Sequence, residues 1–154
     1  MRPWLAPVAR AAEIEALLKK EAAMADASIW DRAAILAGIP VITPATQEEF
    51  VPQMANLDLI GGVSFSKGCY PGQEIVARMH YLGKLKQRMV LAHIDSNTPP
   101  QAGDKLYSAD LAEQSGGAIV NVAAAPDGGF EVLAVVQTSS LGAVTVNLGS
   151  PAGP

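Results

Sequence analysis

The chain has 154 residues, of which 49% are hydrophobic and 17% are charged, and its net charge is −4. This composition excludes a disordered chain and is typical of one globular domain or of two small packed modules. No lysine or arginine follows Lys105, whereas carboxylates continue at Asp110, Glu113, Asp127 and Glu131. Such an acidic balance argues against a protein that coats nucleic acid, although it leaves room for a local basic patch.

Cysteine usage and hydropathy predict the compartment. The one cysteine, Cys69, excludes an intramolecular disulfide and favours a reducing environment. Residues 1–10 lack the apolar core of a signal peptide, and no apolar run reaches the roughly 18–20 residues that cross a bilayer. We therefore expect a cytoplasmic protein without membrane contact.

Two helices are predicted in the first third of the chain. Residues 9–27 are rich in Ala, Leu, Glu and Lys, which favour helices, and their apolar stripe consists of Ile14, Leu17 and Leu18. A second helix is expected over residues 29–37, with Ser28 as its cap and Gly38 and Pro40 as its end. We expect its apolar side to carry Ile29, Ala33 and Leu36.

Connecting structure is expected over residues 43–65. Thr46 followed by Glu49 matches a capping box, which predicts a short helix near residues 47–53 that a proline stops early. A brief extended piece is expected at residues 63–65. This segment is predicted to lie along a surface or an interface.

A third helix is predicted over residues 71–82, because proline suits a first helical turn and Ile75, Met79 and Leu82 line one face. Gly83 can end it. Two charged residues on this helix are spaced for an ion pair, namely Glu74 and Arg78.

The second half of the chain reads as strands. From Lys84 the side chains alternate with a period of two, and short strands separated by turn residues follow. Asp127-Gly128 is the best hairpin turn. This pattern predicts a small antiparallel barrel and an α+β fold, with a helical and mixed module at 1–83 and a barrel at 84–150. The strands are expected at residues 84–92, 105–108, 118–124, 130–137 and 143–148.

Cys69 is the first candidate for chemistry. It lies between two glycines and next to a lysine, at the mouth of the third predicted helix, and both the lysine and the helix favour its thiolate form. The alternative is a buried cysteine that acts as a small hydrophobe. Glu74 is either a general base or amine ligand, or simply a partner of Arg78, while Gln73 either reads a heterocycle or caps a turn.

A basic strip is the second candidate. Arg78, Lys84, Lys86 and Arg88 follow one another without an intervening carboxylate, with His80 and Tyr81 nearby. The strip either meets phosphate or carboxylate groups or is the solvated face of a strand, and four cations are too few to indicate nucleic-acid binding. Neither His80 nor His93 has a carboxylate or cysteine at metal-ligand spacing, so no metal site built by this chain alone is expected.

The octapeptide Lys67-Gly68-Cys69-Tyr70-Pro71-Gly72-Gln73-Glu74 lies within residues 61–78, which closely resemble the signature of the YgfZ family. These folate-binding proteins are related to the aminomethyltransferase (T-protein) of the glycine cleavage system. Upstream, Trp30, residues 37–40 and residues 50–57 are similar in the same order. The resemblance covers about residues 29–137, and one departure is Pro71, where family members often carry threonine.

The resemblance implies a tetrahydrofolate-binding accessory protein, not itself an established enzyme, that supports assembly or repair of iron–sulfur clusters in client enzymes. These clients include enzymes that modify tRNA. It further implies that the barrel is GcvT-like, with Cys69 as the functional thiol and Glu74 as a candidate acid–base group. The folate would be bound by the loop and helix residues Lys67, Gly68, Tyr70, Gly72, Gln73 and Arg78.

Two alternatives to this hypothesis remain open. The first is an aminomethyltransferase-like one-carbon transferase that uses Glu74. The second is a non-catalytic tRNA or protein interaction module that uses residues 78–88. Family members are about twice as long, and their front half supplies most of the pterin pocket. We therefore expect the chain to work together with the remaining half or with a partner chain.

Overall fold

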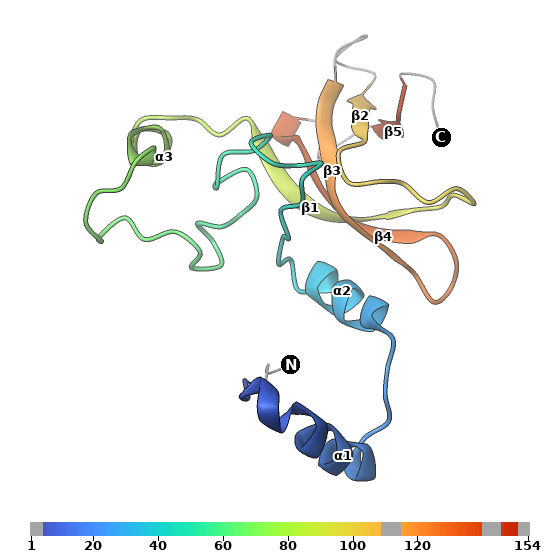
Figure 1. Cartoon of the computed structure of the whole chain (residues 1–154). Coiled ribbons are helices and arrows are strands. Elements are labelled where there is room, and N and C mark those ends of the chain that lie inside the picture. The colour runs from blue at the N-terminus through green and yellow to red at the C-terminus, as the bar shows by residue number, and fades with distance from the viewer. Residues whose placement is uncertain (1–4, 109–114, 140–145, 151–154) are drawn as a thin grey trace.

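The computed structural model describes residues 5–108, 115–139 and 146–150 (Figure 1). Helices come first along the chain and strands follow, which confirms the α+β class. The first residues of the last predicted strand, 143–145, lie outside the described residues. The elements are η1 (Val8–Arg10), α1 (Ala11–Glu21), α2 (Ala27–Leu36), α3 (Gln73–Tyr81), β1 (Gln87–Ile94), β2 (Lys105–Ser108), β3 (Ser115–Ala124), β4 (Phe130–Gln137) and β5 (Val146–Leu148).

The strands form one curled antiparallel sheet in the order β1-β4-β3-β2-β5, which is a half-barrel (Figure 1). Strands β2 and β4 have the bounds that their patterns predict, whereas β1 begins three residues later than predicted, at Gln87. The predicted hairpin joins β3 to β4. There the Ala125 N–H donates to the Gly129 carbonyl over 3.0 Å, and Gly128 takes a φ of +100°, which favours glycine.

Each face of the sheet carries its own buried core. On one face Ile35 of α2 packs with Met89, Leu133 and Val135, and Phe50 and Met54 cover them. The opposite face is formed by strand residues of β2, β3 and β4, namely Leu106, Ile119, Val132, Ala134 and Val136. Burial on two sides explains why β4 has a nearly continuous apolar sequence and not a simple alternation.

A β-bulge in β3 determines which side chains reach the α2 face. The pairing with β4 skips Val120, so that Ile119 lies opposite Ala134 and Asn121 lies opposite Leu133. The extra residue reverses the alternation beyond it. Asn121 is therefore placed on the same face as Leu133, next to α2.

Helix α2 differs from its prediction in its cap and in its buried side. Asp26, not Ser28, is the cap, and its carboxylate accepts from the Ser28 N–H over 2.9 Å. Gly38 ends the helix in a Schellman motif, in which the Ile39 N–H donates to the Ala34 carbonyl over 3.0 Å. The expected apolar side was wrong, because one residue, Ile35, anchors the helix to the sheet while Ile29 and Leu36 remain exposed.

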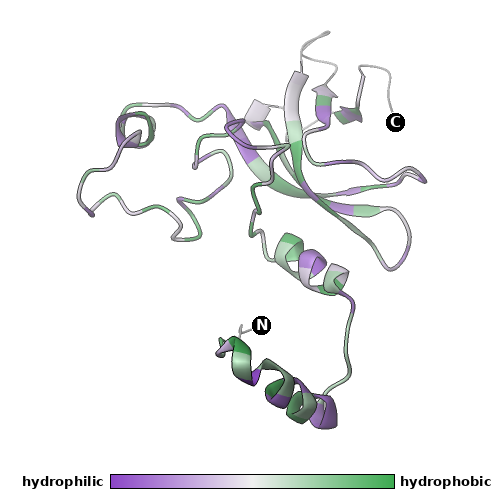
Figure 2. Ribbon diagram, viewed as in Figure 1, coloured by the Kyte–Doolittle hydropathy of each residue, from purple (hydrophilic) through white to green (hydrophobic). Residues whose placement is uncertain are grey.

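The first helix and the connecting segment also depart from expectation. Helix α1 forms, but it buries no residue, and Leu17 and Leu18 are about half exposed; Figure 2 shows its apolar and polar residues intermixed. The predicted capping box is absent, because the Thr46 hydroxyl accepts from the Thr43 N–H and turns replace the helix. Within the described part of the chain, no helix has the length and hydropathy to cross a membrane.

Candidate functional site

The loop that carries Cys69 lies on the surface. The thiol belongs to an exposed, unpaired cysteine, and no hydrogen bond or ion pair engages it in the described residues. The Lys67 ammonium lies 4.4 Å from the centre of the Tyr70 ring, in a cation–π contact. The interpretation of Cys69 as a buried hydrophobe is therefore wrong. A functional thiol must be accessible to solvent, and Cys69 meets this requirement.

Glycine and glutamine shape the turn from this loop into α3. Gly72 is the N-cap with a φ of +81°, a conformation that a helix cannot continue, so α3 begins two residues after Pro71. The Gln73 side-chain carbonyl accepts from the Tyr70 N–H over 3.2 Å. The predicted helix start at Pro71 is corrected, and Gln73 acts here as a turn cap.

A hollow of about 330 Å³ adjoins the Cys69 loop. The hollow is lined in part by Lys67 and Tyr70, which lie on either side of the cysteine in the chain, and by residues 61–64. Pro52 and Leu57 supply apolar walls. The hollow therefore combines apolar surface, an aromatic ring and one ammonium group.

An aromatic cluster lies at the other end of α3. The rings of Phe65 and His80 are stacked with their centroids 3.8 Å apart, and the Tyr81 ring meets both edge-on. Tyr81 is 68% exposed, so part of this cluster faces solvent.

A polar network ties the segment that carries α3 to the sheet. Arg88 of β1 makes a two-pronged ion pair with Asp58, with nitrogen–oxygen distances of 2.7 and 3.0 Å, and it also donates to the Gln53 carbonyl and the Asn56 side chain. The hydrogen bond from Arg88 holds the pKa of Asp58 below its usual range, against the opposing effect of burial.

The same network reaches α3 through one buried glutamine. Gln53 is 2% exposed, and its side-chain N–H donates to the carbonyl of Val76 over 2.7 Å. Among the residues that the structure describes, the Gln53 side-chain oxygen has no hydrogen-bond partner. Since Val76 is the buried residue of α3, this contact fixes the helix that follows the Cys69 loop.

Helix α3 presents a different side to the protein from the one its sequence predicts. Val76 is buried, whereas Ile75 and Leu82 are 62% and 83% exposed. Glu74 and Arg78 are both exposed, and no ion pair joins them. The expected ion pair between them does not form, although Glu74 does lie in the first turn of α3. A catalytic or binding role for either residue stays a prediction.

The predicted basic strip is only partly free. Arg88 forms an ion pair with Asp58, so its prediction as a free cation of the strip is wrong. Arg78, Lys84 and Lys86 are exposed. His93 lies 3.8 Å from the Glu131 carboxylate. No group of three or more potential metal-ligating side chains comes together among the residues that the structure describes.

Sequence reasoning missed the residues that hold the site in place. Gln53, Asn56 and Asp58 received no role, although polar side chains within a segment of apolar residues are a signal of a buried network. Asn121 was also missed. Its position inside an apolar strand is unusual enough to indicate a bulge or a side-chain tether.

Comparison with known proteins tests the resemblance. Over 77 residues the chain is 47% identical to the tRNA-modifying protein YgfZ of Colwellia psychrerythraea, which is 50% of this chain. Over 89 residues, 58% of the chain, it is 43% identical to the tRNA-modifying protein YgfZ of Sodalis glossinidius. The resemblance to YgfZ family proteins is confirmed. No protein-family model matches the chain.

The YgfZ resemblance covers only part of each relative. The matched residues make up 24% of the Colwellia protein and 27% of the Sodalis protein. The function of those complete proteins is therefore only a proposal for this YgfZ-like chain. That proposal rests on the geometry of the chain's own Cys69 loop.

Proposed function

We propose that the chain contributes the thiol-bearing part of a tetrahydrofolate-binding accessory protein that supports iron–sulfur enzymes, including enzymes that modify tRNA, and that has a GcvT-like barrel. The observation that carries the proposal is the exposed Cys69 on a loop that borders a hollow. The 43–47% identity to relatives named tRNA-modifying protein YgfZ supports the same assignment.

The hollow beside the loop fits part of a folate. Its apolar walls at Pro52 and Leu57 and the Tyr70 ring suit a flat heterocycle or a benzoyl ring, and the Lys67 ammonium suits a carboxylate of the glutamyl tail. When bound here, tetrahydrofolate would supply a carrier of one-carbon units. This chain's residues would orient the ligand, and the Cys69 thiol would stand beside it.

A rescue experiment tests the role of the thiol. The whole chain is expressed in bacteria that lack their YgfZ protein, alone and together with the remaining part of the Colwellia relative, and the activity of an iron–sulfur enzyme is measured. We expect Cys69→Ala to abolish rescue and Ser66→Ala, an exposed residue of the same loop, to keep it. Full rescue by Cys69→Ala would remove the thiol from the mechanism.

Calorimetric titration with tetrahydrofolate tests the ligand separately. We expect Lys67→Met to weaken binding relative to Lys86→Met, because Lys67 lines the hollow and Lys86 does not. Binding that appears only with the remaining part of the relative supplied would assign this chain a share of the pocket. Turnover of an aminomethyl donor would instead favour the one-carbon transferase.

The aromatic cluster favours one second candidate, direct contact with tRNA. Tyr81 is exposed, and the exposed cations Arg78 and Lys84 lie three residues before and three residues after it in the chain. Unpaired bases stack on such rings, and cations of this kind bind phosphates. If this candidate is right, Lys84→Glu combined with Lys86→Glu weakens tRNA binding and its dependence on salt. Unchanged tRNA binding by this double variant would exclude it.

A further inference from the structure

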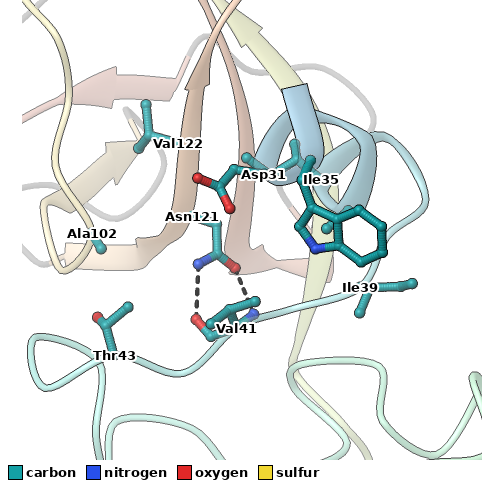
Figure 3. Close-up of a pocket in the computed structure, with 10 residues that line it drawn as sticks. Asp31, Ile35, Ile39, Val41, Thr43, Ala102, Asn121 and Val122 are labelled. Carbon is teal, nitrogen blue, oxygen red and sulfur yellow. Dashed lines mark hydrogen bonds between the residues drawn. The ribbon is translucent and has the colours of Figure 1, made fainter. Parts of the chain in front are cut away.

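A second cavity, of about 310 Å³, lies between α2, the segment that follows it, and β3 (Figure 3). It shares no lining residue with the hollow beside Cys69. Its volume is at the lower end of the range for small-molecule sites. Its walls are mainly apolar, and they include Trp30, Ala34, Ile35, Ile39 and Val122.

One wall of this cavity is fixed by Asn121. Its side-chain oxygen accepts from the Val41 N–H over 2.9 Å, and its side-chain N–H donates to the Val41 carbonyl over 2.8 Å (Figure 3). The amide thus pairs with the backbone as a neighbouring strand would, which holds residues 39–43 at the cavity. Because both ends of the amide are engaged with Val41, Asn121 shapes the cavity instead of recognising a ligand.

The polar group that remains available is the Asp31 carboxylate. Thr43 also lines the cavity, but its hydroxyl already has a partner, the Thr46 hydroxyl, at a distance of 3.3 Å. Asp31 is the one ionisable residue in the lining, and it has no hydrogen bond or ion pair to any side chain within the described ranges. The neighbouring Trp30 is half exposed, so its indole is also open to a ligand.

We propose that this cavity binds a small organic cation, a protonated amine attached to an aromatic or branched apolar body. The carboxylate of Asp31 attracts the ammonium group, and the indole of Trp30 adds a cation–π contribution. The apolar walls cover the body of the ligand. An anionic ligand of the same shape is repelled by Asp31, which separates this site chemically from the lysine-bearing hollow beside Cys69.

The test compares three small probes of similar shape on the whole chain. Binding of 2-phenylethylamine, 2-phenylethanol and phenylacetate is followed by amide NMR shifts. We expect the amine to bind about fivefold more tightly than the alcohol, with phenylacetate weakest. The shifts should map to α2 and residues 39–43, and added salt should reduce the preference for the amine.

A matched pair of variants decides whether Asp31 is responsible. Asp31→Asn should remove the amine's advantage over the alcohol. Asp127→Asn should preserve it, because Asp127 is exposed in the β3–β4 turn and asparagine before glycine suits that turn equally well. The inference is overturned if the amine binds no better than the alcohol, if Asp31→Asn changes nothing, or if the shifts map elsewhere.

Discussion

The sheet and the segment that carries Cys69 differ in how their apolar side chains are covered. Ile119 and Val120 in the sheet are 0% exposed, whereas Ile75 and Leu82 around α3 are mostly exposed. The sheet is held by two apolar cores, while α3 is held by one buried valine and a hydrogen bond from Gln53. The contrast indicates a well-packed scaffold that displays a lightly attached, exposed loop carrying Cys69.

The same substitution in both regions gives the largest expected difference. Leu133 is 1% exposed in the core, so Leu133→Ala should lower the free energy of unfolding by about 2–5 kcal/mol. Leu82→Ala, at an 83% exposed site, should change it by less than about 0.5 kcal/mol. Urea denaturation measures both. Equal losses would contradict the division into scaffold and displayed loop.

The link between the two regions should be the next most costly to break. Arg88→Met leaves the partly buried Asp58 carboxylate, whose side chain is 11% exposed, without its partner and should cost about 2–4 kcal/mol. Lys86→Met is the control, since Lys86 is exposed and has no ion pair to any described residue. Thermal unfolding of the two variants checks this prediction, and similar stabilities would show that the network contributes little.

Acid should weaken this link in the native protein. The folded-state pKa of Asp58 lies below its unfolded value, so its stabilising contribution is complete above the unfolded pKa and is lost as the pH falls through the folded one. We expect stability to decline below about pH 4, and this decline should be smaller in Asp58→Asn. An identical acid profile for both proteins would contradict the assignment.

The bulge in β3 gives a smaller, local effect. Asn121→Ala removes two hydrogen bonds to Val41 and should cost about 1–2 kcal/mol. Hydrogen exchange at the Val41 amide should accelerate, while exchange in β4 stays slow. Unchanged protection at Val41 would mean that the 39–43 segment is held by other contacts.

The smallest effect is expected at the turn into α3. Gly72→Ala forces a side chain into a left-handed conformation and should cost about 1 kcal/mol, although the added methyl group meets no neighbour. Gly68→Ala is a matched control, because it also has open space and does not have a positive φ. Helix content and urea denaturation should distinguish the two variants.

Elements were predictable from sequence where the pattern alone determines them. Strands β2 and β4 have their predicted bounds, and in β4 the apolar run lies between turn residues. The Asp127-Gly128 hairpin forms because glycine suits its backbone. The buried sides of α2 and α3 were wrong, since each short helix packs through one residue, Ile35 or Val76. Which residue that is depends on the partner surface and not on helical spacing.

The exposure of the Cys69 loop was predictable from sequence, but the contacts that support the loop were not. The isolated cysteine between glycines indicated the loop, whose exposure the structure confirms. The partners of Arg88 lie 30 or more residues away in the chain, and the place of Asn121 depends on a register shift. Isolated polar residues in apolar segments indicate that such contacts exist, but no local pattern specifies which residue is the partner or where the bulge lies.

Alkylation of Cys69 in the native protein, with and without tetrahydrofolate, shows whether the exposed thiol stands beside a folate site. We expect the thiol to react without denaturant about as fast as in the unfolded chain, because it is exposed, and saturating tetrahydrofolate to slow the reaction. A thiol that reacts only after unfolding, or a rate that bound tetrahydrofolate leaves unchanged, would contradict this expectation.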